Sequence, residues 1–175
     1  MSVDGACQII VACDVTDASN DQQQATPIAQ ATLANLAQAG IERPKDEGGI
    51  IQAIPATLDN GYDSEAAVEA LETLGFDPYI ATARQRHHGP EADAPETSLT
   101  VQERMAAKVR TPAGKALYAR RKVIVEPVFG QSKEARGFRR FLLRGLANIL
   151  GEWRLVCLTH NLLKIWRYGG VLGTA

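Results

Sequence analysis

Residues 50–82, which read IIQAIPATLDNGYDSEAAVEALETLGFDPYIAT, contain the pattern that decides the fold. Residues 50–58, most of which are apolar, are typical of a strand that ends at Asp59, although Pro55 weakens this assignment. A helical segment follows, and residues 78–82 are a second, short strand candidate. Two strands that are joined by a helical crossover lie parallel in one sheet. The sequence therefore predicts an α/β fold.

Asp59 follows the first of these strands directly, and the turn sequence Asn60-Gly61 after it exposes its side chain. In open α/β sheets functional groups gather at the carboxyl ends of strands, which makes Asp59 a candidate site residue. Asp-Asn-Gly is also a common turn, so a simple turn former is the alternative. The helix that follows is expected to start with Asp63 or Ser64 as its N-cap and to stop at Gly75.

Further elements are predicted on both sides of this unit. They are a buried strand at 7–15, a helix at 21–39 that starts or kinks at Pro27, a helix at 101–110 that Thr111-Pro112 breaks, and a long amphipathic helix at 146–168. The last helix is expected to turn Trp153, Val156, Leu163 and Trp166 inward and to pack His160 in the core. Residues 84–100 are polar and contain prolines, which predicts a flexible insertion in which His87 and His88 have an incidental role.

Charge is distributed unevenly along the chain. Residues 1–100 contain 16 acidic and 4 basic residues, whereas residues 101–175 contain 4 acidic and 15 basic ones. The formal net charges of the two parts are therefore −12 and +11. This asymmetry indicates that the basic part binds a nucleic acid, or that the two parts dock on each other.

The cysteines and the hydropathy indicate a cellular compartment. Cys7, Cys13 and Cys157 are odd in number and have no Cys-x-x-Cys spacing, so buried free thiols in a reducing cytoplasm are expected. The sequence has no run of 18 apolar residues, and the amino-terminal residues lack the basic region of a signal peptide. A cytoplasmic protein without a membrane partner is the resulting prediction.

Residues 118–141, YARRKVIVEPVFGQSKEARGFRRF, place the carboxylate of Glu126 in an apolar stretch that basic residues flank. Such cations neutralise a polyanion, while a carboxylate is the hard oxygen ligand that Mg²⁺ prefers. Helical spacing puts Glu126 and Lys133 on neighbouring turns. Pro127 leaves two alternatives open: the helix bends after Glu126, or a second helix begins there. The simpler interpretation is a basic amphipathic helix in which Glu126 pairs with Lys122.

This segment resembles the C-terminal signature of DDE-type transposases of bacterial insertion sequences, Tyr-x2-Arg-x3-Glu-x6-Lys. Tyr118-x2-Arg121 and Glu126-x6-Lys133 fit the signature. The gap before Glu126 is one residue longer than in the family, so the basic role falls to Arg121 or Lys122. Upstream, residues 58–65 resemble the family's second catalytic motif, which maps its Asp onto Asp59. The resemblance covers nearly the whole chain, with both motifs in the family's order.

The resemblance implies a fold, a reaction and a partner. The fold is a ribonuclease-H-like mixed sheet with flanking helices. Asp59 and Glu126 would be the second and third catalytic carboxylates and would hold Mg²⁺ or Mn²⁺ for two-metal phosphoryl transfer at insertion-sequence ends. The partner is double-stranded DNA, at transposon ends and target. The expected DNA-binding residues are Tyr118, Arg121, Lys122, Lys133, Arg136, Arg139 and Arg140.

The family's first catalytic Asp has no counterpart, because Asp4 and Asp14 lack its sequence context. We therefore expect residues 1–175 to be an N-terminally truncated catalytic domain that lacks the first catalytic strand and is inactive alone. A non-catalytic DNA-binding or regulatory fragment, which holds element ends or inhibits intact transposase, is one alternative. A metal-dependent nuclease that uses Asp14, Asp59 and Glu126 is another, and the Glu126-x6-Lys133 spacing disfavours it.

Overall fold

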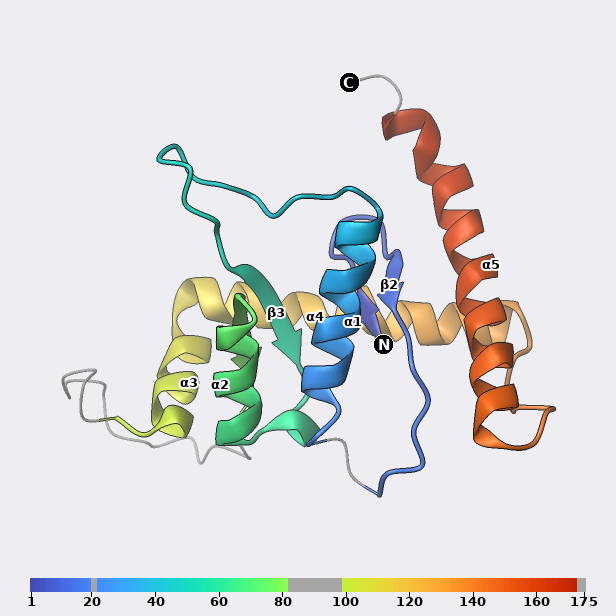
Figure 1. The fold of residues 1–175 in the computed structure, drawn as a ribbon, viewed down its shortest axis with the longest axis horizontal. Coiled ribbons are helices and arrows are strands. Elements are labelled where there is room, and N and C mark those ends of the chain that lie inside the picture. Colours follow the sequence, from blue (N-terminus) through green and yellow to red (C-terminus); the bar gives the residue numbers. More distant parts are fainter. Residues whose placement is uncertain (20–21, 82–98, 173–175) are drawn as a thin grey trace. The chain divides into compact units, whose positions relative to one another are not determined.

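The computed structural model describes residues 1–19, 22–81 and 99–172, which divide into two compact units. The hairpin unit comprises residues 1–19, 31–40 and 122–175, and the crossover unit comprises residues 20–30 and 41–121. Figure 1 labels their helices and strands. Of the predicted insertion at 84–100, residues 84–98, which include both histidines, lie outside the described residues.

The crossover unit contains the predicted pair of parallel strands. Strands β3 (Ile54–Leu58) and β4 (Phe76–Ile80) pair along their whole length, with Ile54 opposite Phe76. Helix α2 (Glu65–Thr73) connects them, which confirms the α/β crossover. Strand β4 begins two residues before the predicted start, because Gly75 reverses the chain with a φ of 82° and the strand follows at once.

Helices α2 and α3 pack against this small sheet, and the core of the crossover unit lies between them. The Ser64 hydroxyl accepts a hydrogen bond from the Ala67 N–H at 3.2 Å, which identifies Ser64 as the N-cap of α2. Helix α3 (Val101–Arg110) has the predicted bounds and starts with a capping box. Figure 1 shows α2 and α3 side by side. The buried apolar side chains of these elements are Ala67, Val68, Leu71, Phe76, Ile80 and Met105.

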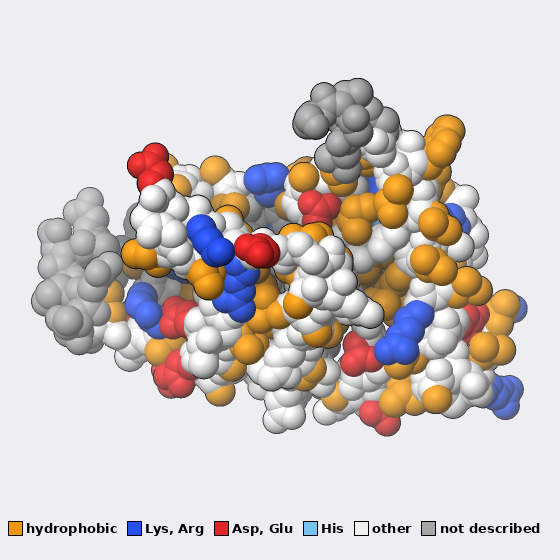
Figure 2. Space-filling model, turned by 45° about the horizontal axis from the view of Figure 1, so that its top comes forward, with side chains coloured by type: hydrophobic (Ala, Val, Ile, Leu, Met, Phe, Trp, Pro, Cys, Tyr) orange, Lys and Arg blue, Asp and Glu red, His pale blue; other side chains and the backbone are white. Residues whose placement is uncertain are grey.

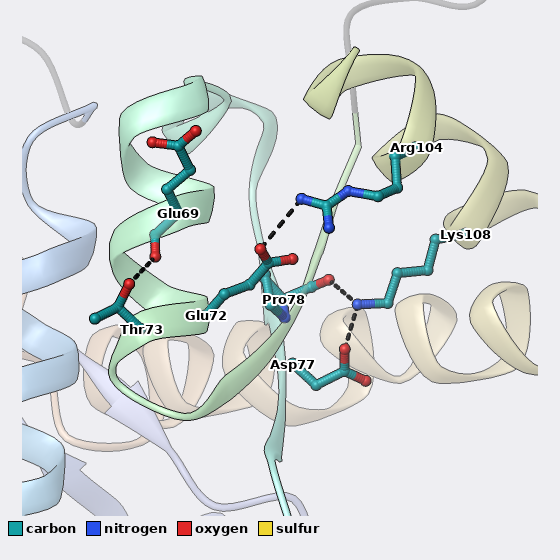
Figure 3. Close-up of polar contacts among 7 residues, drawn as sticks. All are labelled: Glu69, Glu72, Thr73, Asp77, Pro78, Arg104 and Lys108. Atoms are coloured by element: carbon teal, nitrogen blue, oxygen red, sulfur yellow. Dashed lines mark hydrogen bonds and ion pairs between the residues drawn. The ribbon is translucent and has the colours of Figure 1, made fainter. Parts of the chain in front are cut away.

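Charged side chains also join α3 to α2 and β4 (Figure 3). Arg104 Nη2 lies 3.1 Å from Glu72 Oε2. Lys108 pairs with Asp77, donates to the Pro78 carbonyl at 2.8 Å and lies 4.2 Å from the centre of the Tyr79 ring. These cations are therefore occupied by contacts within the crossover unit.

The hairpin unit contains a short antiparallel pair, β1 (Ser2–Val3) and β2 (Ile10–Ala12). The predicted strand at 7–15 is thus reduced to three residues. The core of the hairpin unit consists of Ile10, Val128, Trp153 and Cys157. Helix α1 (Ala25–Gln38) contributes residues to both units, and Pro27 lies in its first turn, where proline is tolerated.

The described strands form two separate two-stranded sheets, β1–β2 and β3–β4. The α/β class is therefore confirmed. The single mixed sheet that the resemblance implies is not formed by the strands in the described part of the chain, and it stays a prediction.

Pro127 lies inside one continuous helix, α4 (Pro112–Gly130), which is followed by the π-helical turn η3 (Gln131–Ala135). The alternative of a second helix beginning there is wrong. Proline has no N–H to donate to the carbonyl four residues earlier, that of Val123. Gln8 Nε2 donates to this carbonyl at 2.9 Å and replaces the missing bond. Gln8 has a φ of 61°, in the left-handed region.

Helix α5 (Leu146–Leu172) is attached to the hairpin by a cluster of polar contacts. His160 is fully buried, as predicted, and its Nε2 donates to the Gln8 carbonyl at 2.8 Å. Burial lowers the pKa of His160, which favours the neutral ring. Lys164 is 3% exposed and donates to Gln8 Oε1 at 2.7 Å. Asn161 accepts from the Ile10 N–H and donates to the Ile10 carbonyl, both at 2.8 Å.

Only one side of α5 is buried. Trp153, Cys157, His160 and Lys164 follow one another at steps of four, three and four residues. Trp166 lies off this stripe and is 80% exposed, so the prediction that it faces inward is wrong. Figure 2 shows hydrophobic side chains exposed along α5. Within residues 1–19, 22–81 and 99–172, no helix combines the length and apolarity that a bilayer crossing needs.

The three cysteines are free thiols, as predicted, but only Cys157 is fully buried. Cys13 packs against the core beside it. A hydrogen bond with the Cys157 thiol, partly opposed by burial, lowers the pKa of Cys13 to about 7.

The amide of Asn161 should be a major contributor to the stability of the hairpin unit. Replacing Asn161 with alanine removes two hydrogen bonds and leaves the N–H and carbonyl of Ile10 unpaired. We expect the free energy of unfolding to fall by about 2–3 kcal/mol in a urea titration. Asn148→Ala is the matched control on the same helix, because it removes one exposed hydrogen bond and should cost less than about 1 kcal/mol. Equal losses in the two variants would contradict this role.

Candidate functional site

Asp59 lies at the carboxyl end of β3, as predicted, and its side chain is 61% exposed. Its Oδ1 accepts from the Asn60 N–H at 2.8 Å and caps the short helix η1 (Asn60–Tyr62). Its Oδ2 lies 3.3 Å from Arg121 Nη1. Asp59 is thus a turn former and also an exposed carboxylate at a strand end, and its role as a site residue stays a prediction.

Arg121 connects the two sequence motifs within the crossover unit. Its side chain is only 20% exposed, and its guanidinium carbon lies 5.6 Å from the centre of the Tyr118 ring. The sequence left the basic role open between Arg121 and Lys122. Arg121 is the one that contacts Asp59, whereas the Lys122 side chain is exposed.

Glu126 lies on the part of α4 that belongs to the hairpin unit, and it is exposed. In the part of the chain that the structure describes, no ion pair joins Glu126 to Lys122. The pairing of Glu126 with Lys122 that the simpler interpretation includes is therefore not formed, while the basic helix that it also includes is present. The unbroken helix keeps Glu126 two turns before Lys133.

The carboxylates of Asp59 and Glu126 have the donor chemistry that Mg²⁺ requires, since both offer hard oxygen atoms to solvent. They belong to different units, the crossover unit and the hairpin unit. Among residues 1–19, 22–81 and 99–172, no three His, Cys, Asp or Glu side chains gather as a metal-binding group. Asp59 and Glu126 are therefore two candidate ligands whose oxygen atoms suit Mg²⁺.

The basic residues after Glu126 fall into two kinds. Lys133, Arg139 and Arg140 are exposed, although Arg139 also pairs with Glu134 at the surface. Arg136 is half-buried, and its guanidinium donates to the Thr159 hydroxyl at 2.7 Å and to the Thr159 carbonyl at 3.0 Å. Arg136 therefore fastens the segment after η3 to α5.

The segment between η3 and α5 is held at its other end by Glu152. The carboxylate of Glu152 accepts from the N–H groups of Leu142 and Leu143 at 3.0–3.1 Å. Between these anchors, Phe138 and Phe141 pack on Trp153. This aromatic cluster was not predicted from the sequence. The alternation Phe138-Arg139-Arg140-Phe141, aromatic and basic residues together, was the signal that could have found it.

In the comparison with known protein families, residues 83–166 match the family described as a transposase DDE domain. No curated protein and no solved structure matches the chain.

Arg136 and Arg140 should respond differently to substitution, although both lie in the basic segment. Arg136→Ala removes charged hydrogen bonds to α5 and should lower the free energy of unfolding by about 1–3 kcal/mol. Arg140→Ala changes an exposed side chain and should stay within about 0.5 kcal/mol of the parent. Thermal denaturation of both variants measures this, and a stable Arg136→Ala protein would refute the anchoring role.

Proposed function

We propose that the chain, whose residues 83–166 match a transposase DDE domain, binds DNA and contributes two catalytic carboxylates to transposition. The observation that carries the proposal is the contact between Asp59 and Arg121. It joins the two motifs that the resemblance singles out, which are 62 positions apart in the sequence. If either motif resembled the family only by accident, there would be no reason to expect Asp59 and Arg121 to be in contact.

Asp59 and Glu126 are the proposed metal ligands. A bound pair of divalent ions activates the attacking oxygen and stabilises the leaving oxygen in this class of reaction. Arg121 would orient Asp59 through the ion pair with its Oδ2, while the Asn60 N–H holds Oδ1. Lys133, two turns beyond Glu126, would neutralise a phosphate near the reacting group.

The number of ligands limits what the chain does alone. Two-metal sites share carboxylates from three positions in this family, and Asp59 and Glu126 are two of them. The open edges of the two small sheets suit pairing with a further strand. We therefore propose that a strand carrying the first Asp completes a ribonuclease-H-like sheet, and that the chain needs it for DNA cleavage.

A second candidate function is a regulatory DNA-binding protein. It is favoured by the exposed cations Lys133, Arg139 and Arg140, which bind phosphates whether or not the carboxylates hold metal. Such a chain would occupy element ends or enter mixed assemblies with intact transposase. Cleavage by the complemented chain decides between the two functions.

The chain should bind duplex DNA with little sequence preference, because residues 101–175 have a formal net charge of +11. Log affinity should fall linearly with log salt concentration, with a slope of about −0.9 per phosphate contacted. Arg139→Ala and Arg140→Ala should each weaken binding to all sequences alike and make the slope shallower by about 1. Fluorescence anisotropy at several salt concentrations measures both effects, and a flat salt dependence would exclude this mode of binding.

The chain alone should not nick plasmid DNA, whereas the chain supplied with the first catalytic strand should do so with Mg²⁺ or Mn²⁺. In the complemented protein, Asp59→Asn and Glu126→Gln should each abolish nicking and leave DNA binding within about twofold, because each removes a metal ligand but no cation. Glu134→Gln is the matched control, since its carboxylate forms a surface ion pair, and it should retain nicking.

Two results would contradict this assignment. Robust metal-dependent nicking by the unmodified chain would show that a third carboxylate is already present. Unimpaired nicking by the complemented Glu126→Gln protein would remove Glu126 from the site.

A further inference from the structure

Two of the three free thiols lie together in the hairpin unit, although they are 144 positions apart in the sequence. Cys13 directly follows β2, and Cys157 lies on the buried stripe of α5. Cys13 packs against the cluster of buried residues to which Cys157 belongs. The fold therefore brings one thiol from a strand end and one from a helix into the same small core.

The hydrogen bonds of Asn161 hold β2 and α5 side by side at this point. Asn161 binds both the N–H and the carbonyl of Ile10, at 2.8 Å each. Cys157 lies about one turn before Asn161 on the helix, and Cys13 lies three residues after Ile10. The placement of the two thiols is therefore fixed by hydrogen bonds that neither thiol makes.

The two thiols differ in how readily they ionise. The hydrogen bond from the Cys157 thiol lowers the pKa of Cys13 to about 7; burial opposes this shift and the charge of Arg154 supports it. The same hydrogen bond, together with burial, raises the pKa of Cys157 well above its usual range. At pH 7 about half of Cys13 is thus thiolate, against about 3% of an ordinary thiol with a pKa of about 8.5. Cys13 is the nucleophile of the pair, and Cys157 is its hydrogen-bond donor.

We propose that Cys13 and Cys157 form a reversible disulfide, in which Cys13 is the thiol that hydrogen peroxide oxidises and Cys157 is the thiol that resolves the product. This inference goes beyond the proposed function, because it requires neither DNA nor a metal ion. Cys13 is half-buried, so a molecule as small as hydrogen peroxide can reach it, whereas Cys157 is 4% exposed and is oxidised through Cys13. An accessible thiolate beside a second thiol is the arrangement of redox-sensitive cysteines.

The oxidation takes place in two steps. The Cys13 thiolate attacks one oxygen of hydrogen peroxide: a sulfur–oxygen bond forms, the oxygen–oxygen bond breaks, and the departing hydroxide takes up the proton that Cys13 had released. The Cys157 sulfur then attacks the sulfenic acid on Cys13: a sulfur–sulfur bond forms, the sulfur–oxygen bond breaks, and the departing hydroxide leaves as water with the Cys157 proton. In total, two thiols are oxidised to one disulfide and hydrogen peroxide is reduced to two waters.

The disulfide would attach β2 to α5 covalently. A hydrogen bond already brings the two sulfur atoms together, and bond formation requires that they approach to about 2.05 Å. The new bond closes a loop that contains most of the chain, which restricts the unfolded chain more than the folded one. Oxidation should therefore fasten α5 on the hairpin, together with Trp153, which lies about one turn before Cys157.

Peroxide treatment of the reduced, folded chain tests the proposal. Peptide mapping by mass spectrometry should find a disulfide between Cys13 and Cys157, with Cys7 still reduced, and dithiothreitol should reverse it. The oxidised chain should unfold at a higher urea concentration than the reduced chain. A disulfide that includes Cys7, no disulfide at all, or an oxidised chain that unfolds at a lower urea concentration would overturn the proposal.

Variants of the helix thiol separate the two roles. In Cys157→Ser and Cys157→Ala, peroxide should leave Cys13 as a sulfenic acid that dimedone traps, because the resolving thiol is gone. The serine hydroxyl still donates a hydrogen bond and alanine does not, so Cys13 should react at least about threefold more slowly in the alanine variant at pH 7. Cys7→Ser is the matched control, because Cys7 is another half-buried thiol of the hairpin unit, and it should form the disulfide at the parent rate.

Cys13→Ser tests the order of oxidation, because Cys157 should then stay reduced in the same concentration of peroxide. Circular dichroism checks that each variant is folded, and if the Cys157 variants are not, Cys13→Ser and the mapping of the parent chain still decide. Oxidation of Cys157 in Cys13→Ser, or equal rates for the serine and alanine variants of Cys157, would overturn the assigned roles. None of these measurements includes DNA, so their failure is distinguishable from a failure of the proposed function.

Discussion

The hydrogen bond from the Gln8 side chain to the Val123 carbonyl is the interaction on which the hairpin unit depends. Without it, Pro127 would leave that carbonyl unpaired and favour a break in α4. Gln8 also accepts two hydrogen bonds from α5: His160 donates to its backbone carbonyl, and Lys164 donates to its side-chain oxygen. Gln8 can meet both helices because its left-handed conformation turns the chain between β1 and β2. One strained residue thus holds two helices to one hairpin.

The attachment of α5 to the hairpin determines how the segment between η3 and α5 presents its side chains. Once His160 and Asn161 fix α5 on the hairpin, Trp153 lies in the core and Glu152 and Arg136 can clamp the segment between η3 and α5. The cations of that segment are then carried by an ordered loop instead of a free tail. Order lowers the entropic cost of placing several charges on one phosphate backbone. Polar contacts, part-buried on the hairpin and exposed at the segment itself, therefore order this surface.

The sequence predicted the features that local signals encode. Ser64 and Gly75 bound α2, and the strand pattern around Asp59 yields the parallel crossover, because caps and periodicity act within a few residues. It could not decide how α4 passes Pro127, since the partner of the Val123 carbonyl, Gln8, lies 115 positions from Val123. Trp166 was placed wrongly because apolar residues on several sides of α5 do not show which side is covered. The aromatic cluster of Phe138 and Phe141 on Trp153 arises from packing between α5 and the segment before it, which periodicity does not report.

The net charge of the basic part overstates the cations that DNA can meet. Arg104, Lys108 and Arg121 pair with carboxylates of the crossover unit, and Arg136 bonds to α5. Lys164 is buried, and burial lowers its pKa, so its charge is disfavoured where it lies. Lys133, Arg139 and Arg140 are exposed beside the aromatic cluster on Trp153. Lys122, Arg144 and Arg154 are exposed as well, so the charge available at the surface is smaller than the count of basic residues and is spread along the basic part.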